Sequence, residues 1–155
     1  MSNVGVFALL WLCPLAAQQK SGRDPADPLI GIANATIEAI KNGNADFLSA
    51  IADPGGVFIG IDGPKISRNR FIQQLSEKRG VYCAIFDSSC LDRKALSLRE
   101  ILAREAVMVE FSKIQGARDQ RAVVLKSKVD PTKILFTIMF STGGKAWKLQ
   151  QIEYW

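Results

Sequence analysis

Two cysteines are the first residues of this chain whose type and spacing suggest chemistry. Cys83 and Cys90 stand in the stretch GVYCAIFDSSC with six residues between them, and the chain contains no histidine. A Cys–His nucleophilic pair and a histidine-containing metal site are therefore excluded. Two cysteines alone do not complete a tetrahedral zinc site, and a redox pair more typically reads Cys-x-x-Cys. We expect a structural Cys83–Cys90 disulfide, worth about 2–3 kcal/mol for so short a loop, with two separately buried thiols as the alternative.

Acid–base chemistry has few candidates. An isomerase-like site needs a carboxylate base in an apolar cavity and a tyrosine or protonated acid as hydrogen-bond donor. Asp62 lies beside a Gly-Pro turn, Asp87 lies inside the cysteine loop, and Glu110 falls on the outward phase of a strand. Tyr82 has the chemistry of a donor, but a buried amphipathic ring is the commoner explanation. We assign no catalytic residue, metal ligand or cofactor, and the balance favours a protein without catalytic activity.

The uneven charge of the chain is compatible with anionic partners, and a solvated surface without a charged partner is the alternative. The formal charge is +5, with three basic and six acidic side chains in residues 20–62 and seventeen basic and nine acidic ones in residues 63–155. A basic half attracts anions at long range, which keeps small acids, lipid head groups and anionic polymers open as ligands. The sequence has no GxxxxGK[ST] phosphate loop and no aromatic–basic stacking motif. We therefore do not expect a nucleic-acid partner.

The N-terminal segment has the composition of an export signal. Residues 1–17, MSNVGVFALLWLCPLAA, carry no charged side chain, and their apolar run is too short to span a bilayer core of about 30 Å. We expect a signal peptide over 1–17, a flexible leader over 18–27 and a single α+β domain over 28–155. Removal of the signal takes Cys13 away and leaves a secreted or periplasmic protein without a membrane span. Disulfides persist in such oxidising compartments. An uncleaved anchor, a lipoprotein modified at Cys13 and a buried helix are the alternatives.

The elements that must position these residues follow from apolar spacing. Three- and four-residue spacing of apolar residues predicts helices, and caps and glycines mark their ends. The chain predicts, in order, a helix from Asp27-Pro28 to Gly43, a short helix capped by Asn44, a strand over Val57 to Ile61, a helix from Ser67 through Lys78 with Gly80 at its end, and a short helix with the capping box Ser97-Leu98-Arg99-Glu100.

From Ala106 the apolar period changes to two, which predicts four consecutive antiparallel strands. The third has an apolar face of Ile134, Phe136, Ile138 and Phe140, opposite Leu135, Thr137, Met139 and Ser141. In the last strand the phase shifts across Gln150-Gln151, which predicts a bulge. The fold class is therefore α+β: N-terminal helices packed on a curved, mainly antiparallel sheet with four consecutive C-terminal strands. Homodimerisation through the sheet's open face is suggested by Met108, Leu135 and Met139 on the outer phase.

This order resembles the nuclear transport factor 2-like (NTF2-like) superfamily, with its cystatin-like α+β cone. The resemblance covers most of residues 28–155. The stretch AIKNGNADFL at 39–48 looks like the family's helix–"GD"–helix opening, although Asn44 stands where Asp is common. VFIGIDG at 57–63 resembles its first strand, RFI at 70–72 sits in the helix that follows, and TGGKAWKL at 142–149 resembles its "GGxWKL" hairpin. The cysteine segment is not a general feature of the family, whose members include isomerases, dehydratases, transport factors and uncharacterised secreted proteins.

Two hypotheses of function follow. The first is an exported, non-enzymatic binding or interaction domain that takes a small apolar or anionic ligand. Its apolar cavity between sheet and helices would be lined by Tyr82, Phe86, Phe111, Phe136 and Trp147. The alternative is a small isomerase- or dehydratase-like enzyme of the same fold, with a cavity carboxylate within reach of Tyr82. The sequence names neither the ligand nor a partner.

Overall fold

The computed structural model describes residues 27–91, 95–143 and 146–154. The expected signal peptide, Cys13 and most of the expected leader lie outside these residues. The described elements are α1 (Pro28–Asn42), α2 (Ala45–Ile51), β1 (Val57–Ile59), β2 (Lys65–Ile66), α3 (Arg68–Ser76), α4 (Val81–Phe86), a 3₁₀ turn (Ser88–Cys90), α5 (Leu98–Arg104), β3 (Val107–Lys113), β4 (Gln120–Ser127), β5 (Ile134–Thr142) and β6 (Trp147–Glu153).

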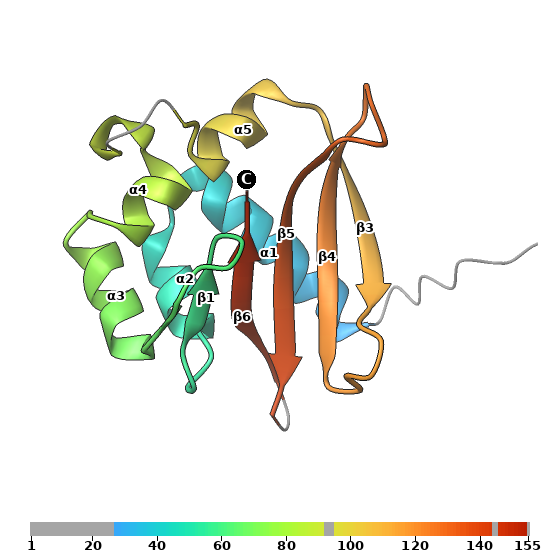
Figure 1. Cartoon of the computed structure of the whole chain (residues 1–155), viewed down its shortest axis with the longest axis horizontal. Helices are drawn as coiled ribbons and strands as arrows, with labels where there is room; N and C mark the ends of the chain where they lie inside the picture. Colours follow the sequence, from blue (N-terminus) through green and yellow to red (C-terminus); the bar gives the residue numbers. More distant parts are fainter. Residues whose placement is uncertain (1–26, 92–94, 144–145, 155) are drawn as a thin grey trace, which may run out of the picture.

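One mixed sheet forms the frame of the fold. Its strands lie in the order β2-β1-β6-β5-β4-β3. β1 pairs with β6 in parallel, and every other neighbouring pair is antiparallel. Figure 1 shows α1 crossing behind the sheet, α3 and α4 gathered beyond its β1–β6 side, and α5 above it. The predicted fold class is confirmed, including the four consecutive C-terminal strands. None of the described helices is long and apolar enough to cross a membrane.

The core lies between the helices and one face of the sheet. It is one cluster of buried apolar side chains, to which β4 contributes Val123 and Leu125 and β5 contributes Phe136, Ile138 and Phe140. Each fully buried aliphatic or aromatic side chain stabilises the fold by about 1.5–3 kcal/mol. The stripe of α1 that faces them consists of Leu29, Ala33, Thr36, Ile37, Ala39 and Ile40.

The predicted caps hold the helices in place. The Asp27 carboxylate accepts a hydrogen bond from the Leu29 amide at 2.9 Å, and Asn44 does the same for Phe47 at 3.0 Å. Gly43 ends α1 in the left-handed region at φ 71°, which glycine adopts without steric cost. Each side-chain cap is worth about 1 kcal/mol.

The segment after α3 differs from the prediction. α3 ends at Ser76 rather than Lys78, because Lys78 takes a positive φ of 51°. Gly80 does not end that helix but precedes α4, where the Gln74 side chain accepts a hydrogen bond from the Val81 amide. The helix VYCAIF at 81–86 was not predicted, because an apolar run this short carries no readable period.

The predicted first strand was two residues too long. It ends at Ile59, and the chain turns through Gly60 at φ 82° and Asp62 at φ 54° before the unpredicted two-residue strand β2. At Gly63 an added Cβ would lie 1.8 Å from the Ile59 carbonyl oxygen. This close approach requires glycine and makes the turn tight.

Two bulges set the register of β5. Phe140 pairs with Leu149 and Met139 with Gln151, so Gln150 is the extra residue of the predicted bulge in β6. A second, unpredicted bulge lies where Leu125 pairs with Phe136 but Lys126 pairs with Ile134. It turns Leu135 into the core, at 7% exposure, and leaves Ile134 42% exposed. The predicted places of these two side chains were therefore wrong, because a bulge reverses the alternation of faces.

Candidate functional site

The predicted Cys83–Cys90 disulfide is present. It joins α4 to the 3₁₀ turn, with the two Cα atoms 5.5 Å apart. Asp87 caps that turn by accepting a hydrogen bond from the Ser89 amide at 3.0 Å. The Ser88 hydroxyl donates to Glu100 at the start of α5 at 2.9 Å. The cysteine loop is therefore a structural segment, in which the disulfide and the Ser88–Glu100 hydrogen bond together link α4 to α5.

The predicted acid candidates have structural or surface roles. Asp62 is exposed at the β1–β2 turn, and Glu110 is exposed and pairs with Lys126 at 2.5 Å. The hydrogen bonds from Ser89 lower the pKa of Asp87. Among the described residues no Asp or Glu is buried, and each carboxyl pKa shift that is resolved there is downward. A general base raised toward neutral pH by an apolar cavity is thus not found in this part of the chain.

The structure does not gather the five predicted pocket residues into one site. Tyr82 and Phe86 lie together on α4, with ring centroids 5.1 Å apart. Phe86 and Phe136 belong to the buried core, whereas Phe111 and Trp147 pack at its margin. Tyr82 lines a surface pocket of about 430 Å³ between the α1–α2 junction, α3 and α4. An apolar ligand cavity between sheet and helices stays a prediction.

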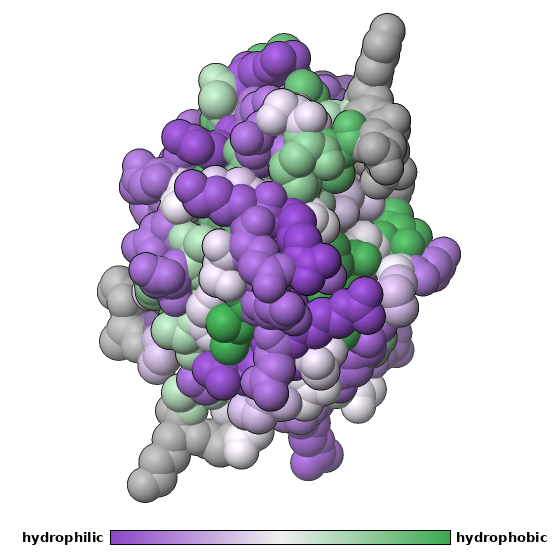
Figure 2. Space-filling model, turned by 90° about the vertical axis from the view of Figure 1, so that its left-hand side faces the viewer, coloured by the Kyte–Doolittle hydropathy of each residue, from purple (hydrophilic) through white to green (hydrophobic). Residues whose placement is uncertain are grey.

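The side of the molecule that carries α3 and α4 is mostly hydrophilic, and its hydrophobic patches are small and separate (Figure 2). This surface lacks the broad apolar area that marks a protein–protein docking face. In the described parts of the chain no group of three or more His, Cys, Asp or Glu side chains is arranged to hold a metal ion.

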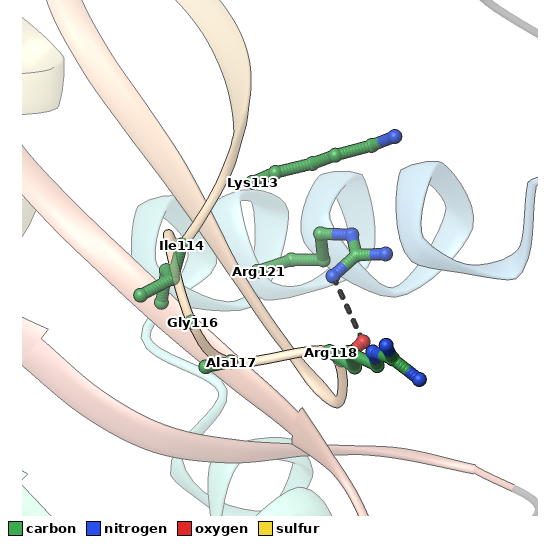
Figure 3. A pocket seen from close by; sticks show the side chains of 6 residues that line it. All are labelled: Lys113, Ile114, Gly116, Ala117, Arg118 and Arg121. Atoms are coloured by element: carbon green, nitrogen blue, oxygen red, sulfur yellow. Dashed lines mark hydrogen bonds between the residues drawn. The ribbon is translucent and has the colours of Figure 1, made fainter.

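A cationic pocket of about 550 Å³ lies at the β3–β4 hairpin (Figure 3). Lys113 and Arg121 come from the ends of the two strands and Arg118 from the turn between them. Figure 3 shows Lys113, Arg118 and Arg121 extending to the same side of the hairpin, with α1 behind them, while Ile114 extends to the other side. The lining residues are Lys113, Ile114, Gly116, Ala117, Arg118 and Arg121.

The hairpin turn sets the pairing of β3 and β4, which places two of these charged residues opposite each other. The Ala117 amide donates to the Ile114 carbonyl at 3.2 Å, and Gly116 takes a positive φ of 81°. The turn is anchored to β5 because the Thr142 amide donates to the Asp119 carbonyl at 2.8 Å. With the turn so closed, Lys113 and Arg121 are direct cross-strand partners.

Arg121 is held in a fixed orientation. Its Nη1 donates to the carbonyl oxygens of Gln120 at 2.7 Å and Arg118 at 3.1 Å. Its guanidinium carbon lies 5.9 Å from the ring centroid of Trp147, a cation–π contact of a kind worth about 0.5–1 kcal/mol at an exposed site. Of the predicted pocket residues, Trp147 is therefore the one that supports this site.

The three cations of the pocket form no ion pair within the described residues. Like charges directly opposite each other on paired strands are destabilising. The sheet cation Lys126 pairs with Glu110, and Lys133 after β4 pairs with Glu105. Within the described ranges, neither Lys113, Arg118 nor Arg121 has a carboxylate within 4.0 Å. The pocket is suited to an external anion.

Sequence reasoning missed Lys113, Arg118 and Arg121 as a site. The turn Gln115 to Asp119 was recognised, and the period of two was read on both strands. The signal that could have found the site was the placement of a basic residue on the inward phase of each strand beside that turn.

Fold and site together define a small α+β domain with a cationic surface pocket. No protein-family model matches the chain, and no curated protein matches it. Among solved structures it is similar to an uncharacterised protein with a cystatin-like fold from Caulobacter vibrioides, at 13% identity and a TM-score of 0.48, covering 82% of this chain and 85% of that one. It is also similar to an NTF2-like protein from Cytophaga hutchinsonii, at 14% identity and a TM-score of 0.40, over 81% and 92% of the two chains.

A third similar structure is a LEH-like epoxide hydrolase from M. tuberculosis, at 14% identity and a TM-score of 0.36, over 81% of this chain and 76% of that one. These similarities concern the fold, and the names agree with the resemblance found in the sequence. No inference about activity follows from them.

Proposed function

We propose that the protein is a non-enzymatic binding domain whose ligand is a small anion held at the cationic pocket of the β3–β4 hairpin. The observation that carries this proposal is the placement of Lys113, Arg118 and Arg121 on one side of the hairpin, with no carboxylate partner among the described residues. Removing an anion from water is costly unless it gains charged hydrogen-bond donors. This pocket offers two guanidinium groups and one ammonium group.

The site has the features of a preformed binding surface. Arg121 is oriented by two carbonyl oxygens and by the Trp147 ring before any ligand arrives. Because its rotamer freedom is already restricted, less entropy is lost on binding. The net charge of +8 over residues 63–155 adds long-range attraction that speeds the encounter with an anion.

The test is a titration of the full chain with sulfate and with inorganic phosphate at low ionic strength, followed by amide chemical shifts and by calorimetry. We expect saturable shifts centred on residues 113–121, and about tenfold weaker binding in Arg121→Gln. Lys128→Gln is the matched control, because it removes one exposed charge beyond the opposite end of β4. Absence of saturable shifts at the hairpin, or an equal loss of affinity in the control, would refute the proposal.

We also propose that the domain acts outside the cytoplasm. The support is the uncharged apolar segment 1–17 and the Cys83–Cys90 disulfide, a bond that persists in oxidising compartments. Cell fractionation and N-terminal sequencing of the native protein test it. A mature chain that begins near Gln18 in the exported fraction is the expected result, and an intact N-terminus with free thiols in the cytoplasm contradicts it.

A further inference from the structure

Resting on the proposed function, we infer that the anion is the dianionic phosphoryl group of a phosphate monoester. The inference concerns the class of ligand, and it follows from the number of cations, their register and the donors that Arg121 leaves unused.

The register favours one compact group. Lys113 and Arg121 are direct partners across β3 and β4, and the Cβ atoms of such a pair lie about 4.5–5.5 Å apart. Arg118, on the same hairpin, contributes the third charge. A phosphoryl group presents two negative charges on three oxygens around one atom. A dicarboxylate spreads the same charge over two separate groups, and a single carboxylate offers half of it.

Arg121 leaves a suitable edge for such a group. Both of its hydrogen bonds within the described residues use Nη1. The edge formed by Nε and Nη2 makes no hydrogen bond within that part of the chain, and two parallel N–H donors on one edge match two phosphoryl oxygens. Lysine, with a single ammonium point charge, cannot provide this paired geometry.

The rest of the pocket accommodates the body of the ester. Ala117 gives it apolar lining, and an added Cβ at Gly116 would meet nothing within 4 Å, so this end of the hairpin leaves open space. The pocket of about 550 Å³ is larger than a bare phosphate needs. The alcohol that carries the phosphate belongs either to a soluble metabolite or to a lipid, and the phosphoryl chemistry is the same for both.

Because the chain contains no histidine, a change in affinity between pH 5.0 and 7.5 can be assigned to the ligand. Unperturbed carboxyl, Lys and Arg side chains titrate outside the interval from pH 5.0 to 7.5, and the α-amino group titrates just above it. The acid of the hairpin turn, Asp119, is exposed. A monoester takes up its second negative charge with a pKa of about 6. Its dianion fraction therefore rises about tenfold across this interval, whereas sulfate stays a dianion throughout.

The experiment measures the affinity of the full chain for glycerol 3-phosphate, sulfate and acetate by calorimetry at pH 5.0 and 7.5. We expect the affinity for glycerol 3-phosphate to rise about tenfold, that for sulfate to stay constant and that for acetate to stay weak. Arg121→Lys keeps the charge but removes the paired donors, so it should weaken glycerol 3-phosphate at least fivefold. Lys128→Gln should bind like the parent protein.

The outcomes separate the two proposals. If the affinity for glycerol 3-phosphate does not change with pH while sulfate binds at the hairpin, the site holds anions without requiring a dianionic phosphoryl group, and only the present inference is overturned. If neither anion gives saturable binding, the proposed function fails and this inference fails with it. Co-sedimentation with vesicles that contain phosphatidic acid identifies the lipid source, and vesicles of phosphatidylcholine alone serve as the control.

Discussion

Lys113 and Arg121 lie opposite each other across one hairpin, so binding and stability should respond in opposite directions to one substitution. Lys113→Glu replaces a repulsive cross-strand pair by an attractive one, worth about 0.2–1 kcal/mol. We expect the free energy of unfolding in urea to rise by that amount while anion binding is lost. Lys128→Glu, which faces no cross-strand partner in β3, should change neither quantity appreciably. A loss of stability in Lys113→Glu would show that the pair is not repulsive.

At the residue scale, Glu100 should make the stability of the fold depend on pH in the acid range. The hydroxyl of Ser88 and then the amide and hydroxyl of Ser97 donate to its carboxylate and lower its pKa. A lowered pKa in the folded state means that the carboxylate stabilises the fold above its unfolded pKa, and that this stability is lost as pH falls through the folded pKa. Glu100→Gln should therefore remove part of the decline in stability between about pH 5 and pH 3, near the ordinary glutamate pKa.

The measurement is the urea midpoint as a function of pH for the parent protein and for Glu100→Gln. Glu38→Gln is a control on the exposed face of α1, where the carboxylate pairs with Lys41. Parallel pH profiles for the parent protein and Glu100→Gln would contradict the prediction.

At the scale of elements, the disulfide should stabilise the α4 segment. It closes a loop between residues seven positions apart in the chain, and loop-closure entropy for a ring of this size gives about 2–3 kcal/mol. The double variant Cys83→Ala, Cys90→Ala should lose about this amount in urea unfolding. Reduction of the parent protein should cause a similar loss and should leave the variant unchanged. A variant as stable as the oxidised parent would remove the structural role.

The elements also show what sequence reasoning could and could not predict. Asp27, Asn44 and Ser97 were recognised as caps because their side chains bond amides two or three residues ahead, a local interaction. The bulge at Gln150 was visible because the apolar phase breaks there. The bulge at Leu135 was not visible, because Ile134 and Leu135 are both apolar and either one satisfies the pattern. Pairing with β4 makes the choice, and pairing is not local.

At the scale of the whole molecule, the α+β order could be predicted because period-two alternation runs through four successive strands. The candidate site was missed, because its side chains come from β3, the turn and β4, and only the paired register of the two strands brings them together. Trp147 was selected as an aromatic pocket residue, and its actual contact, the Arg121 guanidinium, lies two strands away in the sheet. The residue types alone do not reveal that Trp147 and Arg121 lie close together.

The outer face of the sheet leads to the last prediction, which concerns assembly. Leu135 is removed from this face because it is buried in the core. Ala122 and Val124 on β4 still lie beside Met139 and Thr137 on β5, as direct cross-strand pairs. Val124 and Met139 are only partly buried, so the centre of this face is apolar and accessible. The Lys126–Glu110 pair beside it supplies charges of both signs, which two copies related by a two-fold axis can match.

We therefore expect a homodimer through this face. Light scattering coupled to size exclusion should give twice the mass of one chain for the parent protein. Val124→Asp should give the mass of one chain, because a partly buried carboxylate at the centre of an interface would lose its water without gaining a partner. Asn34→Asp adds the same charge on the exposed side of α1 and should remain dimeric. A parent protein with the mass of one chain at every concentration would show that this face stays open to solvent.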